Sequence, residues 1–111
     1  MQKFKELFES NENVQVGDIF YSDWGYDQSN IDFYQVTGKR GKSTVEIRQI
    51  GSKSVGQKGG YDKLVPVPNQ FIGPVLKKRI DKSGWIKIED GIFASKFDKP
   101  YVLGTSLGMG R

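Results

Sequence analysis

The spacing of apolar residues changes once along this chain, from a helical period to a strand period. Phe4, Leu7 and Phe8 recur at i, i+3 and i+4, which predicts a short amphipathic helix within residues 1–10. Because two helical turns are only marginally stable in isolation, we expect these three side chains to be buried against the rest of the domain. Residues 10–13 are polar and end the helical pattern.

After residue 13 the pattern is typical of short strands separated by turns. The first three predicted strands span residues 18–24, 30–37 and 43–50. The third alternates strictly, with Val45 and Ile47 on one face and Thr44, Glu46 and Arg48 on the other. A short glycine-flanked turn with a basic tip joins the second strand to the third, so we expect these strands to form a meander.

The second half of the chain predicts shorter elements. Residues 51–60 are rich in glycine and predict a flexible loop. The two prolines of residues 64–68 restrict that segment to an edge strand or an extended conformation. Strands predicted over residues 75–80 and 85–89 flank the turn sequence Asp81-Lys82-Ser83-Gly84, a pattern that predicts a second hairpin.

Two short closing strands, over residues 92–94 and 101–103, complete the predicted set, and residues 104–111 predict a flexible tail. Six or seven short strands in meander order within 111 residues predict one mainly β domain, with its strands within residues 14–103. A small antiparallel SH3-like barrel is the architecture that we expect first, and a curved sheet is the alternative. An OB-like barrel is less consistent with the pattern, because no helix is predicted between the third and fourth strands.

The chain contains no cysteine and no histidine. Disulfides, zinc–thiolate sites and cysteine nucleophiles are therefore excluded, together with the commonest general base and the commonest transition-metal ligand. We accordingly expect a non-enzymatic protein with no cofactor and no metal site. The lack of an apolar run of ~20 residues and of a signal-peptide core predicts a cytoplasmic protein that does not bind a membrane.

Charge is segregated along the chain, although the net charge of +4 is modest. Residues 1–36 contain two basic and seven acidic side chains, a net charge of −5, whereas residues 37–88 contain twelve basic and three acidic ones, a net charge of +9. Residues 89–111 contain three of each and are neutral. Such a dipolar surface suits a strongly charged partner, and its basic part suits a polyanion such as nucleic acid.

Seven cations and one tryptophan from this basic part are the candidate binding residues. A polyanion requires cations on one face, with exposed aromatic rings if unpaired bases are to stack. Trp85 points outward if the alternating Ile86 and Ile88 are core, and an outward tryptophan suits base stacking and a protein interface equally. This set, hereafter the basic face, is Lys39, Arg40, Lys42, Lys77, Lys78, Arg79, Lys87 and Trp85.

The segment between the first two predicted strands, residues 24–30 (WGYDQSN), is more polar than a simple turn requires. One interpretation is an ordered wide turn, in which its Asp, Ser and Asn side chains bond to nearby backbone. The other interpretation is a recognition loop that presents Trp24, Tyr26 and Gln28 to a partner.

Residues 24–36 (WGYDQSNIDFYQV) resemble a family of short, uncharacterised proteins carried by phages and other mobile elements, with the pattern W-G-Y-[DE]-Q-[TS]-N-[IV]-D-[FY]-Y-Q-V. Residues 16–21 (VGDIFY) and 44–48 (TVEIR) are similar to the same family, and the likeness weakens over residues 64–101. The family has no established activity, so the resemblance implies a mobile-element setting and little chemistry.

Two hypotheses of function follow from these observations. The first is that the protein binds nucleic acid, or a nucleic-acid-binding protein complex of the host, through the basic face. The second is that it is an anti-defence, anti-CRISPR-like inhibitor or adaptor that acts in the host cytoplasm by protein–protein interaction. Binding to bare nucleic acid separates the two hypotheses.

Overall fold

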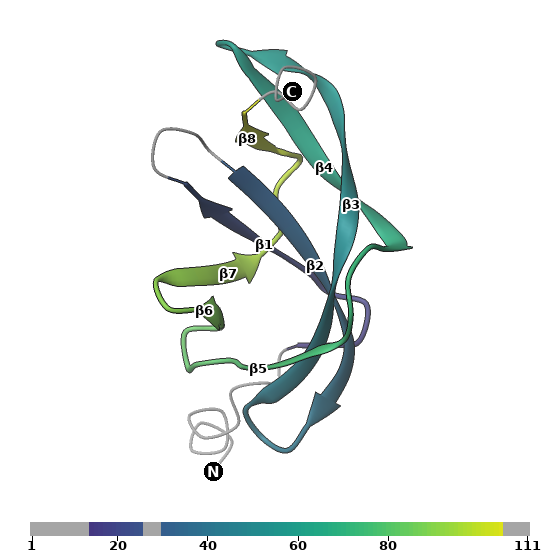
Figure 1. Cartoon of the computed structure of the whole chain (residues 1–111), viewed down its shortest axis with the longest axis vertical. Coiled ribbons are helices and arrows are strands. Elements are labelled where there is room, and N and C mark those ends of the chain that lie inside the picture. Colours follow the sequence, from purple (N-terminus) through teal and green to yellow (C-terminus); the bar gives the residue numbers. More distant parts are fainter. Residues whose placement is uncertain (1–13, 26–29, 106–111) are drawn as a thin grey trace.

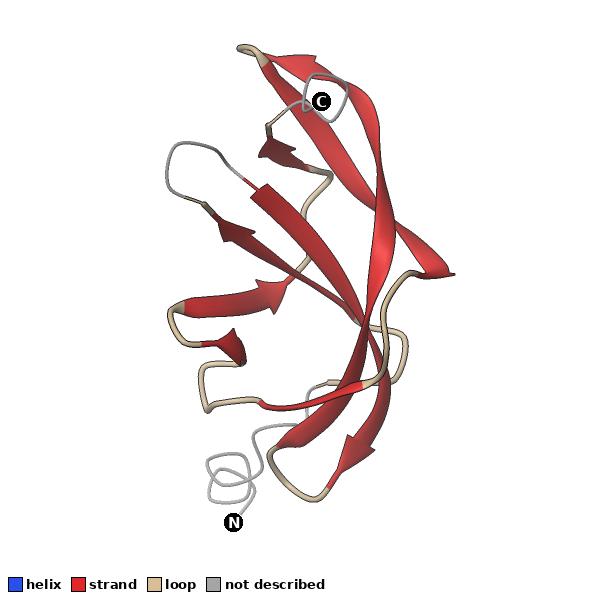
Figure 2. Cartoon of the chain, in the orientation of Figure 1, coloured by secondary structure: helices blue, strands red, loops and turns tan. Residues whose placement is uncertain are grey.

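Eight antiparallel strands form a single sheet in the computed structural model, which describes residues 14–25 and 30–105 (Figure 1). The strand order is β6-β7-β1-β2-β3-β4-β8, and β5 pairs with β3 outside this path. No helix occurs in this described part of the chain (Figure 2). The strands are β1 (Ile19–Trp24), β2 (Asn30–Arg40), β3 (Thr44–Lys58), β4 (Tyr61–Phe71), β5 (Leu76–Arg79), β6 (Ile86–Glu89), β7 (Ile92–Lys96) and β8 (Val102–Gly104).

The prediction of a mainly β, antiparallel domain is confirmed, whereas the prediction of a closed barrel is wrong. The two end strands of the sheet, β6 and β8, do not pair with each other and lie far apart (Figure 1). The long strand β3 pairs with β5 near its start, over Thr44–Ile47, and with β4 further along, from Ile50 to Lys58. The molecule is elongated, with extents of 50 × 26 × 25 Å along its principal axes.

Two predictions fall wholly or largely outside the described residues. The N-terminal helix within residues 1–10 is one of them, so the burial of its aromatic side chains stays a prediction. The tail over residues 104–111 is the other, although its first residue, Gly104, belongs to β8 rather than to a flexible segment.

The flexible loop predicted over residues 51–60 is wrong, because this segment belongs to a long hairpin. β3 continues to Lys58, and β4 begins at Tyr61. Between them Gly59 and Gly60 have φ angles of 60° and 88°, the left-handed values that a two-residue hairpin turn requires and that glycine adopts without strain. The glycine pair therefore marks a tight turn, which lets the flanking residues pair as strands.

The second predicted hairpin has the predicted turn but not the predicted strand pairing. Asp81 holds the turn, since its Oδ1 accepts hydrogen bonds from the backbone N–H groups of Ser83 and Trp85 at 2.9 and 3.0 Å. A single bridge joins Ile80 to Ile86, and beyond it β5 pairs with β3 while β6 pairs with β7. The conformation of a turn depends on hydrogen bonds between residues a few positions apart, and the sequence shows these directly. The partner of a strand depends instead on which apolar faces meet in the core.

The middle of β2 is buried on both faces, and β1 is buried on one face and half-buried on the other, so these two strands lie between two core clusters. One cluster includes Phe20 and Tyr34 and lies against β3, β5, β6 and β7. The other includes Phe33, with Tyr21 packed against it, and lies against β3, β4 and β8. Because successive residues of a strand point to opposite faces, each adjacent aromatic pair supplies one ring to each cluster.

The two prolines of β4 lie where one side of that strand is open, which agrees with the prediction of an edge. β8 pairs with β4 only from Asp62 to Leu64. Beyond this point, two hydrogen bonds between Gln35 of β2 and Asn69 of β4 connect the two strands. Gln35 Nε2 donates to Asn69 Oδ1 at 3.0 Å, and Gln35 Oε1 accepts the Asn69 backbone N–H at 2.8 Å.

Candidate nucleic-acid interface

β5 lies beside the end of the sheet where β2 turns into β3, and this brings two basic segments together. Three rows of paired residues cross β2, β3 and β5: Arg40–Thr44–Arg79, Lys39–Val45–Lys78 and Gly38–Glu46–Lys77. Paired residues share a face of the sheet, so Arg40, Lys77 and Arg79 lie on the outer face. Lys78 shares its row with the buried Val45 and lies toward the inner side. The predicted cations therefore gather at one end of the sheet but divide between its two faces.

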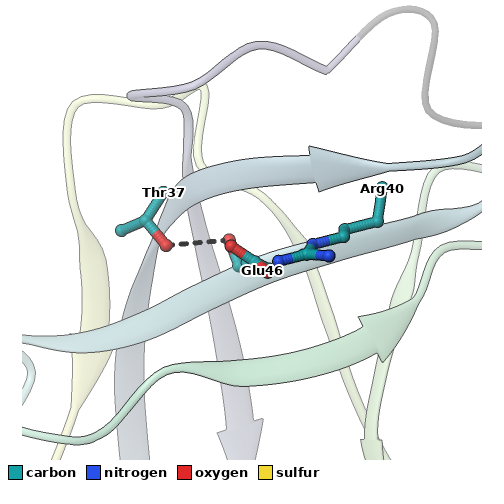
Figure 3. Close-up of polar contacts among 3 residues, drawn as sticks. All are labelled: Thr37, Arg40 and Glu46. Atoms are coloured by element: carbon teal, nitrogen blue, oxygen red, sulfur yellow. Dashed lines mark hydrogen bonds and ion pairs between the residues drawn. The ribbon is translucent and has the colours of Figure 1, made fainter.

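Glu46 lies within this group of cations and pairs with Arg40 (Figure 3). Arg40 Nε donates to Glu46 Oε2 at 2.6 Å, and Thr37 Oγ1 donates to the Glu46 backbone carbonyl at 3.3 Å. The carboxylate reaches Arg40 across Gly38, where a Cβ atom would come within 2.7 Å of Glu46 Oε1. The glycine thus leaves room for Glu46 to pair with Arg40 rather than with Lys77, which is opposite Glu46 on β5.

Most of the predicted cations are not neutralised by a neighbouring carboxylate. Besides Arg40, only Lys87 among the seven has an ion pair with a residue in the described ranges, to Asp90 Oδ1 at 3.2 Å. Both side chains of that pair are exposed, and such pairs contribute little. The five cations without an ion pair in this part of the chain are Lys39, Lys42, Lys77, Lys78 and Arg79.

Trp85 points outward, as predicted, and lies next to a second exposed aromatic ring. Trp85 is 49% exposed and Phe93 is 42% exposed, and their ring centroids are 6.2 Å apart. Lys87 is the strand partner of Phe93, so the cation and the two rings share the outer side of β6 and β7. Phe93 is absent from the residues predicted from the sequence. Its alternation with the buried Ala94 signals that it points outward, but not that Trp85 and Lys87 lie beside it.

A shallow depression connects this aromatic pair with the cations of β5. Its lining includes Ser43, Arg79, Trp85, Lys87 and Phe93. An adjoining groove between β5 and β6 is lined by Lys77, Lys78, Arg79, Lys87, Ile88 and Glu89. Because Arg79 and Lys87 line both hollows, the cations of β5 and the two rings form one continuous surface. The hairpin tip joins it through Ser43, whose carbonyl accepts the Ile80 backbone N–H at 2.8 Å.

Trp24 lies at the other end of β2 from the basic tip. Its indole Nε1 donates to Asp32 Oδ2 at 2.8 Å, and Gln49 Nε2 donates to the other carboxylate oxygen of Asp32 at 3.2 Å. β2 has 11 residues, which at the rise of a strand separates this end from Arg40 by about 30 Å. Trp24 is therefore not part of the basic face. The other two candidate residues of this segment, Tyr26 and Gln28, lie outside the described residues.

Two structural features are absent from residues 14–25 and 30–105. Those residues contain no group of three or more His, Cys, Asp or Glu side chains that is suited to hold a metal ion. They also contain no helix that is long and apolar enough to cross a membrane.

Comparisons with known proteins assign no family to the chain. No protein-family model, no curated protein and no solved structure matches it. The resemblance of residues 24–36 to mobile-element proteins therefore stays a prediction.

Proposed function

We propose that the protein is a non-enzymatic, cytoplasmic accessory protein of a phage or other mobile element that binds nucleic acid, or a nucleic-acid–protein complex, through the basic face. The observation that carries the proposal is the pairing of β5 with β3. Through this pairing, cations from the hairpin tip, β5 and β6 gather at one end of the molecule, and five of them have no ion pair with a described residue. Nucleic acid binds such a surface because the lysine and arginine side chains neutralise its phosphates. The counterions that were condensed on those phosphates are then released into solution, which favours binding.

A second candidate function is that of an anti-defence, anti-CRISPR-like inhibitor or adaptor that binds a host protein complex. The observation that favours it is the exposed pair of rings, Trp85 and Phe93. Tryptophan is among the residues that most often anchor protein–protein interfaces, where it fills a pocket of the partner.

Binding of the purified protein to bare DNA and RNA at low salt tests the first function against the second. We expect fluorescence anisotropy of labelled oligonucleotides to show saturable binding, because phosphate contacts need no protein partner. Absence of binding to both nucleic acids, together with co-purification of a host protein complex, would reject the first function in favour of the second.

Replacing Glu46 with Gln should strengthen binding to nucleic acid. The substitution keeps the size of the side chain and its hydrogen-bonding oxygen, but it removes the negative charge that pairs with Arg40. One additional available cation should raise the affinity severalfold and steepen the slope of log K against log salt by about 0.7–0.9.

Asp23→Asn is the matched control for Glu46→Gln, because it changes the net charge by the same amount. Asp23 lies on β1 and pairs with Ile31, at the end of β2 opposite to Arg40. We expect a much smaller effect from this control, since exposed charges beyond about 10 Å are screened at 0.1 M salt. Equal effects of the two variants would argue against a contact surface around Arg40.

A further inference from the structure

A second basic cleft lies beside Trp85 and adjoins the depression that borders β5. It is open, has a volume of about 440 Å³, and is bounded by the 81–85 turn, by β1 and by the end of β7. Its cations are Lys82, Lys96 and Lys99, and one carboxylate, Asp98, also lines it. None of these lysines belongs to the basic face. Trp85 and Lys82 line both this cleft and the depression beside β5, so the two hollows meet at the turn.

Two of these lysines are held in place by neighbouring groups. Lys99 Nζ lies 3.0 Å from the Tyr21 hydroxyl oxygen and 5.3 Å from the centre of the same ring. This hydrogen bond with the Tyr21 hydroxyl raises the pKa of Lys99. Lys96 Nζ lies 3.3 Å from Asp18 Oδ2, a partly exposed pair in which the lysine side chain retains about half of its exposure (49%).

We propose that the basic face and this cleft together bind one single-stranded nucleic acid, which crosses Trp85 and continues between Lys96 and Lys99. The inference rests on the proposed function and specifies its ligand. A nucleic acid that occupies both hollows must pass Trp85, which lines each of them. A single strand can follow a short, uneven path of this kind, whereas duplex DNA is stiff over about 150 base pairs. The exposed Trp85 ring can stack only on a base that is not already within a duplex. Cations on both sides of the ring would hold the flanking phosphates.

The test compares binding to a labelled oligothymidylate and to a mixed-sequence DNA duplex of equal length, over a series of salt concentrations. We expect tighter binding to the single strand. Trp85→Ala should weaken binding to the single strand on the order of 10- to 100-fold, with little effect on the duplex, whereas Trp85→Tyr should retain most of the affinity because it keeps a ring for stacking. Circular dichroism melting checks that the variants are folded.

The cleft is tested with the double variant Lys96→Gln and Lys99→Gln, because glutamine keeps a polar side chain at each position. Loss of two phosphate contacts should flatten the single-strand salt slope by about 1.4 and weaken binding on the order of tenfold at 0.1 M salt. The matched control is Lys53→Gln with Lys58→Gln, which removes the same charge from exposed positions in the distal part of β3.

The outcomes distinguish the inference from the function on which it rests. Equal affinity for duplex and single strand, with no loss in Trp85→Ala, would overturn the inference and leave nucleic-acid binding intact. Identical results for the two double variants would likewise overturn the role of the cleft. Failure of the unmodified protein to bind either these DNAs or single- and double-stranded RNA at low salt would reject the proposed function itself.

Discussion

The affinity for nucleic acid should fall about a thousandfold or more when salt is raised from about 50 to 200 mM, on the basis of six or so phosphate contacts. The number of contacts follows from the seven cations of the basic face: five have no ion pair with a described residue, Arg40 is paired with Glu46, and the pair of Lys87 with Asp90 is exposed and therefore weak. The measurement is a series of anisotropy titrations, from which the slope of log K against log salt is obtained.

The triple variant Lys77→Ala, Lys78→Ala and Arg79→Ala should remove about three of these contacts. We expect the slope to flatten by about 2 to 3 and the affinity at 0.1 M salt to fall on the order of a hundredfold. The loss should be the same for every sequence tested, because phosphate contacts carry no information about the bases.

A control with the same change in net charge is available in the long β3–β4 hairpin. Lys53, Lys58 and Lys63 lie in its distal part, and Lys58 is separated from Thr44, the strand partner of Arg79, by roughly 45 Å along β3. Replacing all three with Ala should leave most of the salt dependence in place. If both triple variants lose affinity equally, binding follows the overall charge of the protein and the basic face is not its site.

The variant Phe33→Ala should destabilise the protein by about 3–5 kcal/mol. Phe33 is 1% exposed and belongs to the smaller core cluster, whose other buried members among the described residues are Ile50, Leu64 and Val102. Its ring packs edge-on against that of Phe97, with centroids 5.4 Å apart. Deleting a fully buried ring leaves a cavity, so a large part of a typical stability of about 5–15 kcal/mol should be lost. Urea unfolding followed by circular dichroism measures the change.

Phe93→Ala is the matched control for Phe33→Ala, since it deletes the same ring from a position that is 42% exposed. We expect its effect on the free energy of unfolding to be below about 1 kcal/mol. Equal destabilisation by the two variants would show that the smaller cluster contributes no more than a surface contact. Phe93→Ala also provides a folded protein in which the ring beside Trp85 is missing.

The sequence predicts the local features of the candidate surface well. Strict alternation around Val45 and Ile47 predicts the two faces of β3, and both side chains are buried. The same rule predicts that Trp85 points outward between a turn and the buried Ile86. These predictions succeed because the direction of a side chain in a strand depends on its position relative to its immediate neighbours.

The sequence predicts less well where two signals overlap. Residues 51–60 are rich in glycine, which is typical of loops, yet the Gly59–Gly60 pair makes a tight turn between two long strands. The consecutive aromatic residues of β1 and β2 predict strands without showing which face is buried. The middle of β2 is buried on both faces, and a strand in that position has no need to alternate.

By itself the sequence determined the mainly β class, the Asp81 turn, the basic tip of the β2–β3 hairpin and the absence of histidine and cysteine chemistry. Only the tertiary structure decided that β5 pairs with β3 rather than with β6, which brings Arg79 across from Thr44 and the basic segments together. The tertiary structure also decided that Trp85 lines two adjoining basic hollows. The physical reason is that periodicity sets which face of a strand is apolar, whereas the partner of that strand depends on how distant apolar faces bury one another in the core.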